Sequence, residues 1–137
     1  MKPTVILLPL TLALGVAFGV VGNKQVSAQQ QAIKRTSLQK IDLTGMEGKE
    51  LNMWITEIAP GAASGRHYHP GHEVVYVLEG SYTLDIEGKP PAMLKAGDSA
   101  HNAPKVVHDA KNNTTAPVKL LVVLVGEKGQ PLTVPVQ

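Results

Sequence analysis

The chain has no cysteine, so no disulfide can stabilise it, and its fold must depend on the core, aided by a bound metal or a partner subunit. Aromatic residues are also scarce. The single phenylalanine, Phe18, lies in an apolar N-terminal segment, which leaves Trp54 and three tyrosines for the remainder. Segments with helical periodicity and internal repeats are absent as well. We therefore expect an aliphatic core built from strands.

Residues 1–28 have the pattern of a secretory signal peptide. Lys2 supplies the positive start, residues 5–21 are apolar apart from Thr11, and residues 26–28 form a small-residue cleavage site. The alternative is an uncleaved membrane anchor, but the run is near the lower limit for a span and contains proline and glycine. We expect a periplasmic or secreted protein that is not membrane-bound after cleavage.

Cleavage would leave 109 residues, the size of one domain. We divide them into a flexible lead (29–35), a domain (36–127) and a C-terminal tail (128–137). Lys2 and Lys24 would leave with the signal, so 11 basic residues would face 11 acidic ones. A neutral domain argues against a nucleic-acid partner.

Short β-like runs, separated by turn residues every eight to twelve positions, predict an all-β sandwich or barrel. Residues 36–43 and 51–58 alternate between polar and apolar. Residues 73–78 are apolar on both faces, as in a fully buried strand, and we expect them to form a hairpin with residues 81–86. Residues 118–125 predict another buried strand.

The five histidines occupy two short segments: His67, His69, His72, His101 and His108. Residues two apart on a strand share a face, so His67 and His69 can direct both imidazoles to one point. A turn at residues 70–71 can return Glu73 to that point, and His108 is the natural fourth donor. Three imidazoles and a carboxylate suit one divalent Fe, Mn, Ni, Cu or Zn ion without selecting among them.

The first histidine segment resembles the first motif of the cupin superfamily. That motif reads glycine, five residues, His-x-His, three residues, glutamate, six residues, glycine, and its fixed positions are filled by Gly61, His67, His69, Glu73 and Gly80.

The second cupin motif is similar to the segment from Gly97 to Asn112, which contains His108 in register. Ala103 stands where proline is usual and Lys105 where glycine is usual, so the turn between them is atypical. The spacing from Gly97 to His108 is intact.

The resemblance implies a small single-domain cupin of the quercetin-dioxygenase-like group, with a jelly-roll β-barrel enclosing the metal. His67, His69, Glu73 and His108 would be the ligands, leaving two positions of an octahedral ion open. It favours a metal-dependent enzyme acting on a small oxygenated molecule, with Glu73 leaving the ion transiently as a base. A non-catalytic metal or ligand binder and a homodimer with a stabilising metal remain as alternatives.

Relatives of this size commonly pair, so we expect a homodimer in which residues 36–43 add to a partner's sheet.

One of His101 and Asn102 should point into the barrel. We predict a catalytic role for His101 as a general base or hydrogen-bond donor, and a solvent-facing His101 is the alternative.

His72 is expected to be exposed, and Trp54 is expected to pack in the core or at the rim of the barrel. Arg66 should face away from the metal, and a carboxylate clamp at this residue is the lesser alternative.

Overall fold

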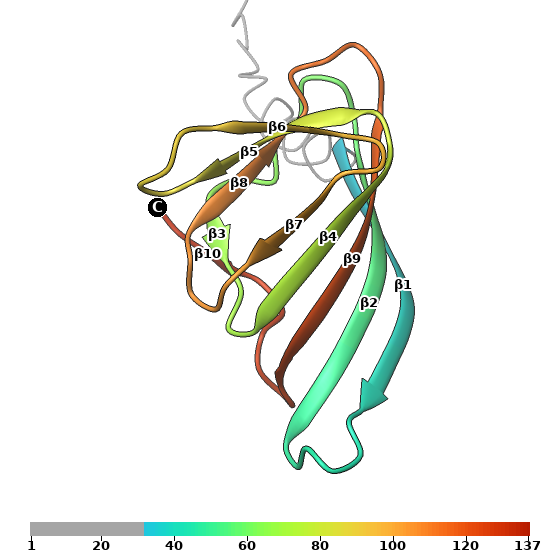
Figure 1. Cartoon of the computed structure of the whole chain (residues 1–137), viewed down its shortest axis with the longest axis vertical. Coiled ribbons are helices and arrows are strands. Elements are labelled where there is room, and N and C mark those ends of the chain that lie inside the picture. Colours follow the sequence, from blue (N-terminus) through green and yellow to red (C-terminus); the bar gives the residue numbers. More distant parts are fainter. Residues whose placement is uncertain (1–31) are drawn as a thin grey trace, which may run out of the picture.

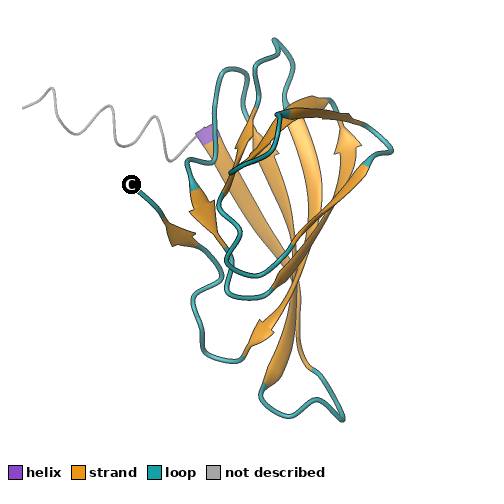
Figure 2. Cartoon of the chain, turned by 60° about the vertical axis from the view of Figure 1, so that its left-hand side comes forward, coloured by secondary structure: helices purple, strands orange, loops and turns teal. Residues whose placement is uncertain are grey.

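The computed structural model describes residues 32–137, which form ten β-strands in two sheets (Figure 1). Sheet A contains, in spatial order, β1 (Ile33–Asp42), β2 (Lys49–Ile58), β9 (Val118–Glu127), β4 (His72–Glu79) and β7 (Ser99–Asn102). Sheet B contains β10 (Val134–Pro135), β3 (His67–Tyr68), β8 (His108–Lys111), β5 (Ser81–Ile86) and β6 (Ala92–Lys95). The strand pairs are antiparallel, and the two sheets enclose one interior (Figure 2), which confirms the predicted all-β jelly-roll class.

The core lies between the two sheets. Its fully buried apolar side chains come from β2, β4 and β9 of sheet A and β5 of sheet B: Trp54, Ile58, Val75, Val77, Tyr82, Leu84, Val118, Leu120, Val122 and Leu124. Most of them are β-branched or aliphatic, which suits a pleated surface packed on one side. The aliphatic core expected from the composition is therefore present.

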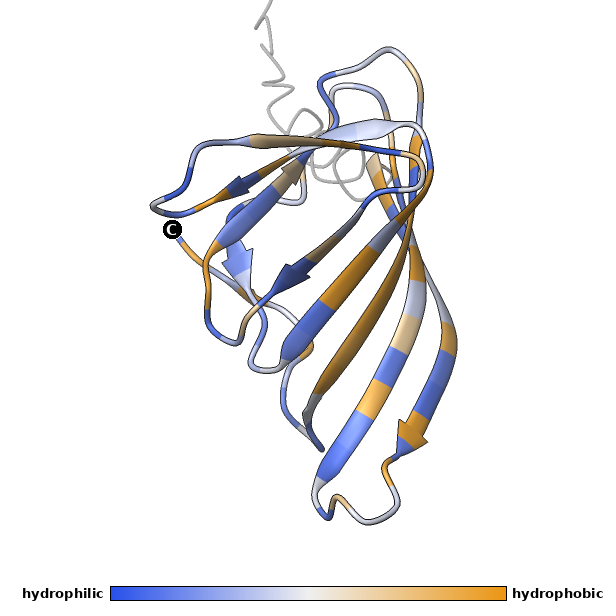
Figure 3. Cartoon of the chain, in the orientation of Figure 1, coloured by the Kyte–Doolittle hydropathy of each residue, from blue (hydrophilic) through white to orange (hydrophobic). Residues whose placement is uncertain are grey.

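Only one face of β4 is buried, which corrects the prediction of a strand buried on both faces. Val75 and Val77 point inward, whereas Val74, Tyr76 and Leu78 are 47%, 45% and 38% exposed. An antiparallel sheet needs one covered face, and no described element lies over the outer face of sheet A. Figure 3 shows apolar residues running along β4 and β9.

The chain does not form a hairpin between β4 and β5, so that prediction is wrong. The strand β4 pairs with β7 and β9, while β5 pairs with β6 and β8 in the other sheet. Gly80 is the corner at which the chain changes sheets. Its φ is +78°, and a Cβ atom there would lie 2.7 Å from the carbonyl oxygen of Pro117. Glycine is required by both the conformation and the close backbone approach.

The ends of the domain extend further than the sequence suggested. The predicted flexible lead ended at residue 35, but β1 begins at Ile33 because residues 33–35 pair with the end of β2. The predicted tail contributes β10, which pairs with β3. The predicted signal peptide, residues 1–28, lies outside the described residues. Among residues 32–137 no helix is long and apolar enough to cross a membrane.

Candidate metal centre

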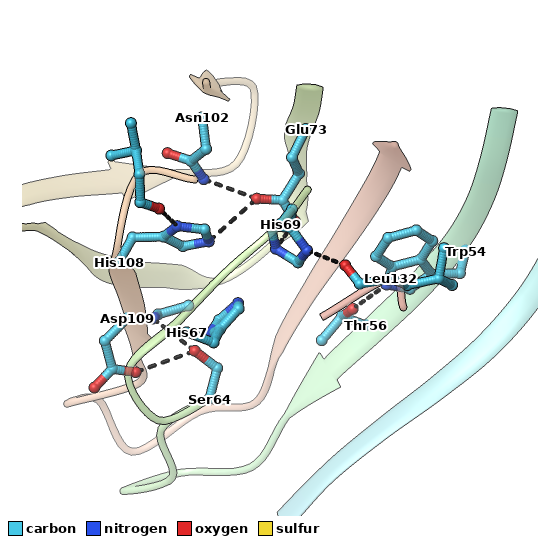
Figure 4. Close-up of polar contacts among 12 residues, drawn as sticks. Trp54, Thr56, Ser64, His67, His69, Glu73, Asn102, His108, Asp109 and Leu132 are labelled. Carbon is cyan, nitrogen blue, oxygen red and sulfur yellow. Dashed lines mark hydrogen bonds and ion pairs between the residues drawn. The ribbon is translucent and has the colours of Figure 1, made fainter. Parts of the chain in front are cut away.

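Three histidines converge inside the barrel (Figure 4). His67 on β3 is the cross-strand partner of His108 on β8, and His69 follows β3 directly. One ring nitrogen from each lies within 4.8 Å of the others, and the three residues are 6%, 4% and 2% exposed respectively. The predicted shared face of His67 and His69 is confirmed, and His108 joins them as expected.

Each ring is held by a backbone carbonyl on its outer nitrogen. The Nδ1 atoms of His67, His69 and His108 lie 2.6, 2.5 and 2.9 Å from the carbonyl oxygens of Gly65, Leu132 and Val106, respectively. A carbonyl can only accept, so each Nδ1 carries the hydrogen. Each Nε2 is then the ring atom that faces the centre, and in the neutral ring it carries the lone pair that a metal-binding imidazole needs.

Glu73 completes the cluster from β4. Its Oε1 lies 3.2 Å from the Nε2 of His69, and its Oε2 lies 3.3 Å from the Nε2 of His108. Asn102, its cross-strand partner on β7, donates from Nδ2 to Oε2 over 2.8 Å and fixes the carboxylate. Nitrogen and carboxylate lone pairs facing each other at this distance require a cation between them, either a proton or a metal ion.

The ionisation of the cluster agrees with this charge pattern. Burial opposes ionisation of Glu73, but the contacts of its carboxylate with His108, His69 and Asn102 outweigh it and hold the pKa of this carboxyl well below its usual range. Burial likewise works against a charged His108, yet its hydrogen bond with Glu73 raises the pKa of His108. For His67 burial dominates and lowers the pKa. Without a metal, the proton of the cluster therefore resides between His108 and Glu73.

One buried nitrogen still lacks a hydrogen-bond partner among the described residues. The Nε2 of His69 is enclosed and accepts no hydrogen bond. A buried polar atom without a partner costs roughly 1–3 kcal/mol, so it is tolerated where a ligand supplies the missing interaction. The donor set of three imidazoles and an adjacent carboxylate suits a divalent transition metal. The residues present therefore fit the predicted metal.

The turn between the ligands behaves as the sequence indicated. Residues 70–71 carry the chain from β3 of sheet B to β4 of sheet A and so place Glu73 beside His69. A Cβ atom at Gly71 would lie 2.2 Å from the carbonyl oxygen of Val125. This contact leaves no room for a side chain and explains the glycine.

Asn112 of the second motif has a structural role. It is fully buried, its Nδ2 donates to the carbonyl oxygens of Ile58 and Ala116, and its Oδ1 accepts from the backbone and hydroxyl of Thr114. This amide joins the ends of β2 and β9 and is no part of the metal cluster.

His101 does not reach the centre: of the two orientations that the sequence left open, the structure shows the solvent-facing one, so the predicted catalytic role of His101 has no geometric basis here. In β7 the inward position belongs to Asn102, because Asn102 is the cross-strand partner of inward-facing Glu73. His101 is exposed on the outer face, where its Nε2 lies 3.0 Å from the Nδ1 of His72 and the two rings stack. The expected exposure of His72 is confirmed.

A cavity of about 430 Å³, its open mouth included, extends from the centre towards solvent. Trp54, Val75 and Leu120 form part of its apolar wall, while exposed Arg35 of β1 lines it near the edge of sheet A. Arg66 lies outside this cavity and pairs with Glu87 over 2.8 Å.

Tyr82 lines the same cavity from β5 and was not identified as a site residue from the sequence. Burial, and then the charge of Glu73, raise the pKa of Tyr82, so its hydroxyl stays protonated. The hydroxyls of Thr56 and Ser64, by contrast, already bond Trp54 and Asp109. Among residues 32–137 no protein group hydrogen-bonds the Tyr82 hydroxyl. The one available sequence signal was its place in an alternating strand just after Gly80.

The family profile described as "Cupin domain" (Cupin_2) matches residues 54–124, just over half of the chain. The chain belongs to the cupin family. No curated protein matches this cupin.

Solved structures resemble this cupin in fold. DMSP lyase DddQ from Ruegeria pomeroyi is 21% identical, with a TM-score of 0.65 over 88% of this chain and 56% of that one. The polyketide cyclase RemF from Streptomyces resistomycificus is 20% identical, with a TM-score of 0.62 over 78% and 72%. An RmlC-like cupin from Shewanella frigidimarina is 26% identical, with a TM-score of 0.57 over 72% and 79%. The chain spans about half the length of the DMSP lyase structures that it matches.

Proposed function

We propose that this cupin holds one divalent transition metal through His67, His69, His108 and Glu73 and acts on a small oxygenated molecule in the adjacent cavity. The observation that carries the proposal is the buried, unpartnered Nε2 of His69, directed at the Glu73 carboxylate 3.2 Å away. Two acceptors enclosed this closely are stabilised by a shared cation. Fe, Mn, Ni, Cu and Zn all suit this donor set.

When bound, the ion supplies a Lewis acid that polarises an oxygen atom of the substrate. Glu73 remains anionic because its pKa is held low, and Asn102 keeps its carboxylate in place. Tyr82 offers a protonated hydroxyl to a substrate oxygen. The apolar wall lowers the polarity of the surroundings of the reacting group. In this scheme the transient base role of Glu73 is a prediction, and Tyr82 takes the donor role that the sequence suggested for His101.

Two reaction classes fit these groups. Dioxygenase-like chemistry follows from the resemblance of the motifs. Proton-transfer chemistry without oxygen is supported by the protonated Tyr82 and by neighbours named DMSP lyase and polyketide cyclase. A cavity that opens to solvent favours either over a purely structural metal, whose site would be closed. A metal or ligand binder without turnover remains the non-catalytic alternative.

Metal analysis of the protein purified from its native compartment tests the site. We expect about one ion per chain in the wild type and none in the His67→Ala/His69→Ala variant. The matched control is His72→Ala/His101→Ala, which removes two exposed histidines and should keep the ion. Stoichiometric metal in the first variant would overturn the assignment.

Oxygen uptake with phenolic substrates then separates dioxygenase chemistry, which consumes oxygen, from lyase or cyclase chemistry, which does not.

We also propose that the protein is exported after removal of residues 1–28. The support is the charged start, apolar run and small-residue site of that segment. Mass spectrometry of the exported protein should find Gln29 at the N-terminus. An intact Met1 terminus on a membrane-bound protein would indicate an anchor instead.

A further inference from the structure

We infer that Arg35 forms an anion subsite at the mouth of the cavity and that the substrate or ligand is a small molecule with an apolar body and a carboxylate. This inference rests on the proposed function for the metal-directed end of the molecule. The Arg35 subsite itself is argued from the geometry of β1.

The register of β1 turns Arg35 towards the cavity. Arg35 is the direct cross-strand partner of Thr56, whose side chain is buried on the inward face of β2. Directly paired residues of an antiparallel ladder point to the same face of the sheet. Lys34, one residue earlier, therefore faces outward and lies 3.7 Å from Glu57.

The charge of Arg35 is not neutralised inside the cavity. Glu73, the carboxylate that lines the same space, is engaged by His69, His108 and Asn102. Among residues 32–137 no carboxylate lies within ion-pair distance of Arg35, whereas Arg66 is paired with Glu87. A cavity holding a divalent ion beside one carboxylate, with an arginine at its rim, is net positive and attracts anions.

The wall between the two charged ends is apolar. Trp54, Ile58 and Val122 line the cavity together with Arg35. A guanidinium binds a carboxylate with two parallel hydrogen bonds, which gives both orientation and selectivity. An amphiphilic carboxylate thus matches the cavity better than a neutral phenol, because its charge meets the guanidinium of Arg35.

The sequence analysis did not identify Arg35 as a site residue. Arg35 lies in the segment assigned to the flexible lead, and its relation to the site arises from the β1–β2 pairing. Arg66 was the arginine close in sequence to the ligands, and its ion pair with Glu87 places it elsewhere.

Trp54 provides the readout, because it is the single tryptophan of the chain and lines the cavity. The probes are butanoate and butanamide, which share a shape and differ in charge. Tryptophan fluorescence titrations on zinc-loaded and metal-free protein give the dissociation constant of each. In both forms of the protein, Arg35→Gln should weaken butanoate binding about three- to tenfold, the range for a charge-assisted bond at a partly exposed site, and leave butanamide unchanged.

Lys34→Gln is the matched control, since it removes the same charge one residue away on the opposite face. Arg35→Lys should restore part of the affinity. Equal effects of Arg35→Gln and Lys34→Gln on butanoate would overturn the subsite. So would butanoate binding that survives Arg35→Gln and disappears in the metal-free protein, although the proposed metal function would then stand. Conversely, Arg35-dependent butanoate binding in a protein that takes up no metal would support the subsite and refute the proposed function.

Discussion

The backbone N–H of Lys105 donates a hydrogen bond to the carbonyl oxygen of His69 over 2.8 Å, so the atypical turn of the second motif supports a ligand of the first. Lys105 has a φ of +63° and is the one non-glycine residue in the left-handed region within residues 32–137. Glycine usually fills this position in the motif that the sequence resembles. The lysine therefore adopts a strained conformation to keep the bond to His69.

Replacing Lys105 by glycine should stabilise the protein by about 0.5–1 kcal/mol. The left-handed conformation costs a side-chain-bearing residue about 1–2 kcal/mol, and the added freedom of glycine in the unfolded chain cancels part of that gain. Chemical denaturation of the metal-free protein measures the difference. Lys105→Ala, which keeps a Cβ atom, should show no such gain, and equal stability of the glycine variant and the wild type would contradict the strain.

Metal affinity should increase as the pH rises above 6.5, the ordinary histidine value. The raised pKa of His108 means that the metal-free cluster keeps a proton above that pH, and a metal ion must displace it. His67 does not compete, because its pKa is lowered and its ring is already neutral. Calorimetry of zinc binding in buffers of different ionisation enthalpy should detect release of about one proton near pH 6.5 and less at higher pH. Zinc binding without proton release at pH 6.5 would contradict the proton shared by His108 and Glu73.

Gly71→Ala should destabilise the protein by about 3 kcal/mol and reduce metal binding. The new Cβ atom would lie 2.2 Å from the carbonyl oxygen of Val125, so the turn that places Glu73 must shift. Gly88→Ala is the control: its φ is also unfavourable at +77°, but nothing lies within 4 Å of the added atom, so about 1 kcal/mol is expected. Thermal unfolding of both variants with and without zinc measures the contrast. Similar losses at the two positions would show that the turn can relax.

The homodimer expected from the sequence, with residues 36–43 adding to a partner's sheet, remains a prediction, and the structure offers the partner a second surface, the outer face of sheet A. Val74, Tyr76 and Leu78 are exposed together there, and Leu38 and Ile41 are exposed on the edge strand β1. A partner copy would cover this apolar surface. Sedimentation at micromolar concentration should give a dimer for the wild type and a monomer for Tyr76→Lys. Met93→Lys, which changes a residue 74% exposed on β6 of sheet B, should remain dimeric. A monomeric wild type would refute the pairing.

Three of the four ligands could be predicted from one short segment, and His108 from its register in the second motif. The two-residue spacing of His67 and His69, followed by the tight turn before Glu73, determines their shared face without knowledge of the rest of the fold. Other parts depend on which strands pair. The exchange of sheets at Gly80 depends on which strands β4 and β5 pair with, and the orientation of His101 depends on the pairing of Glu73 with Asn102. Arg35 likewise joins the cavity through its pairing with Thr56. These relations join positions far apart in the sequence, and spacing within one segment does not specify them.

The three carbonyl groups that hold the imidazoles have an evolutionary consequence. They belong to the main chain of Gly65, Val106 and Leu132, so the side chains of Val106 and Leu132 can change without changing the tautomer of any ligand. Gly65 is constrained separately, because its φ of +76° disfavours any side chain. Leu132 is 38% exposed and can be exchanged for many residues. An insertion or deletion between Glu127 and Leu132 cannot be tolerated in the same way, because it would displace the carbonyl oxygen of Leu132 from the Nδ1 of His69. Relatives with this centre should therefore vary in composition but keep constant length along this C-terminal stretch.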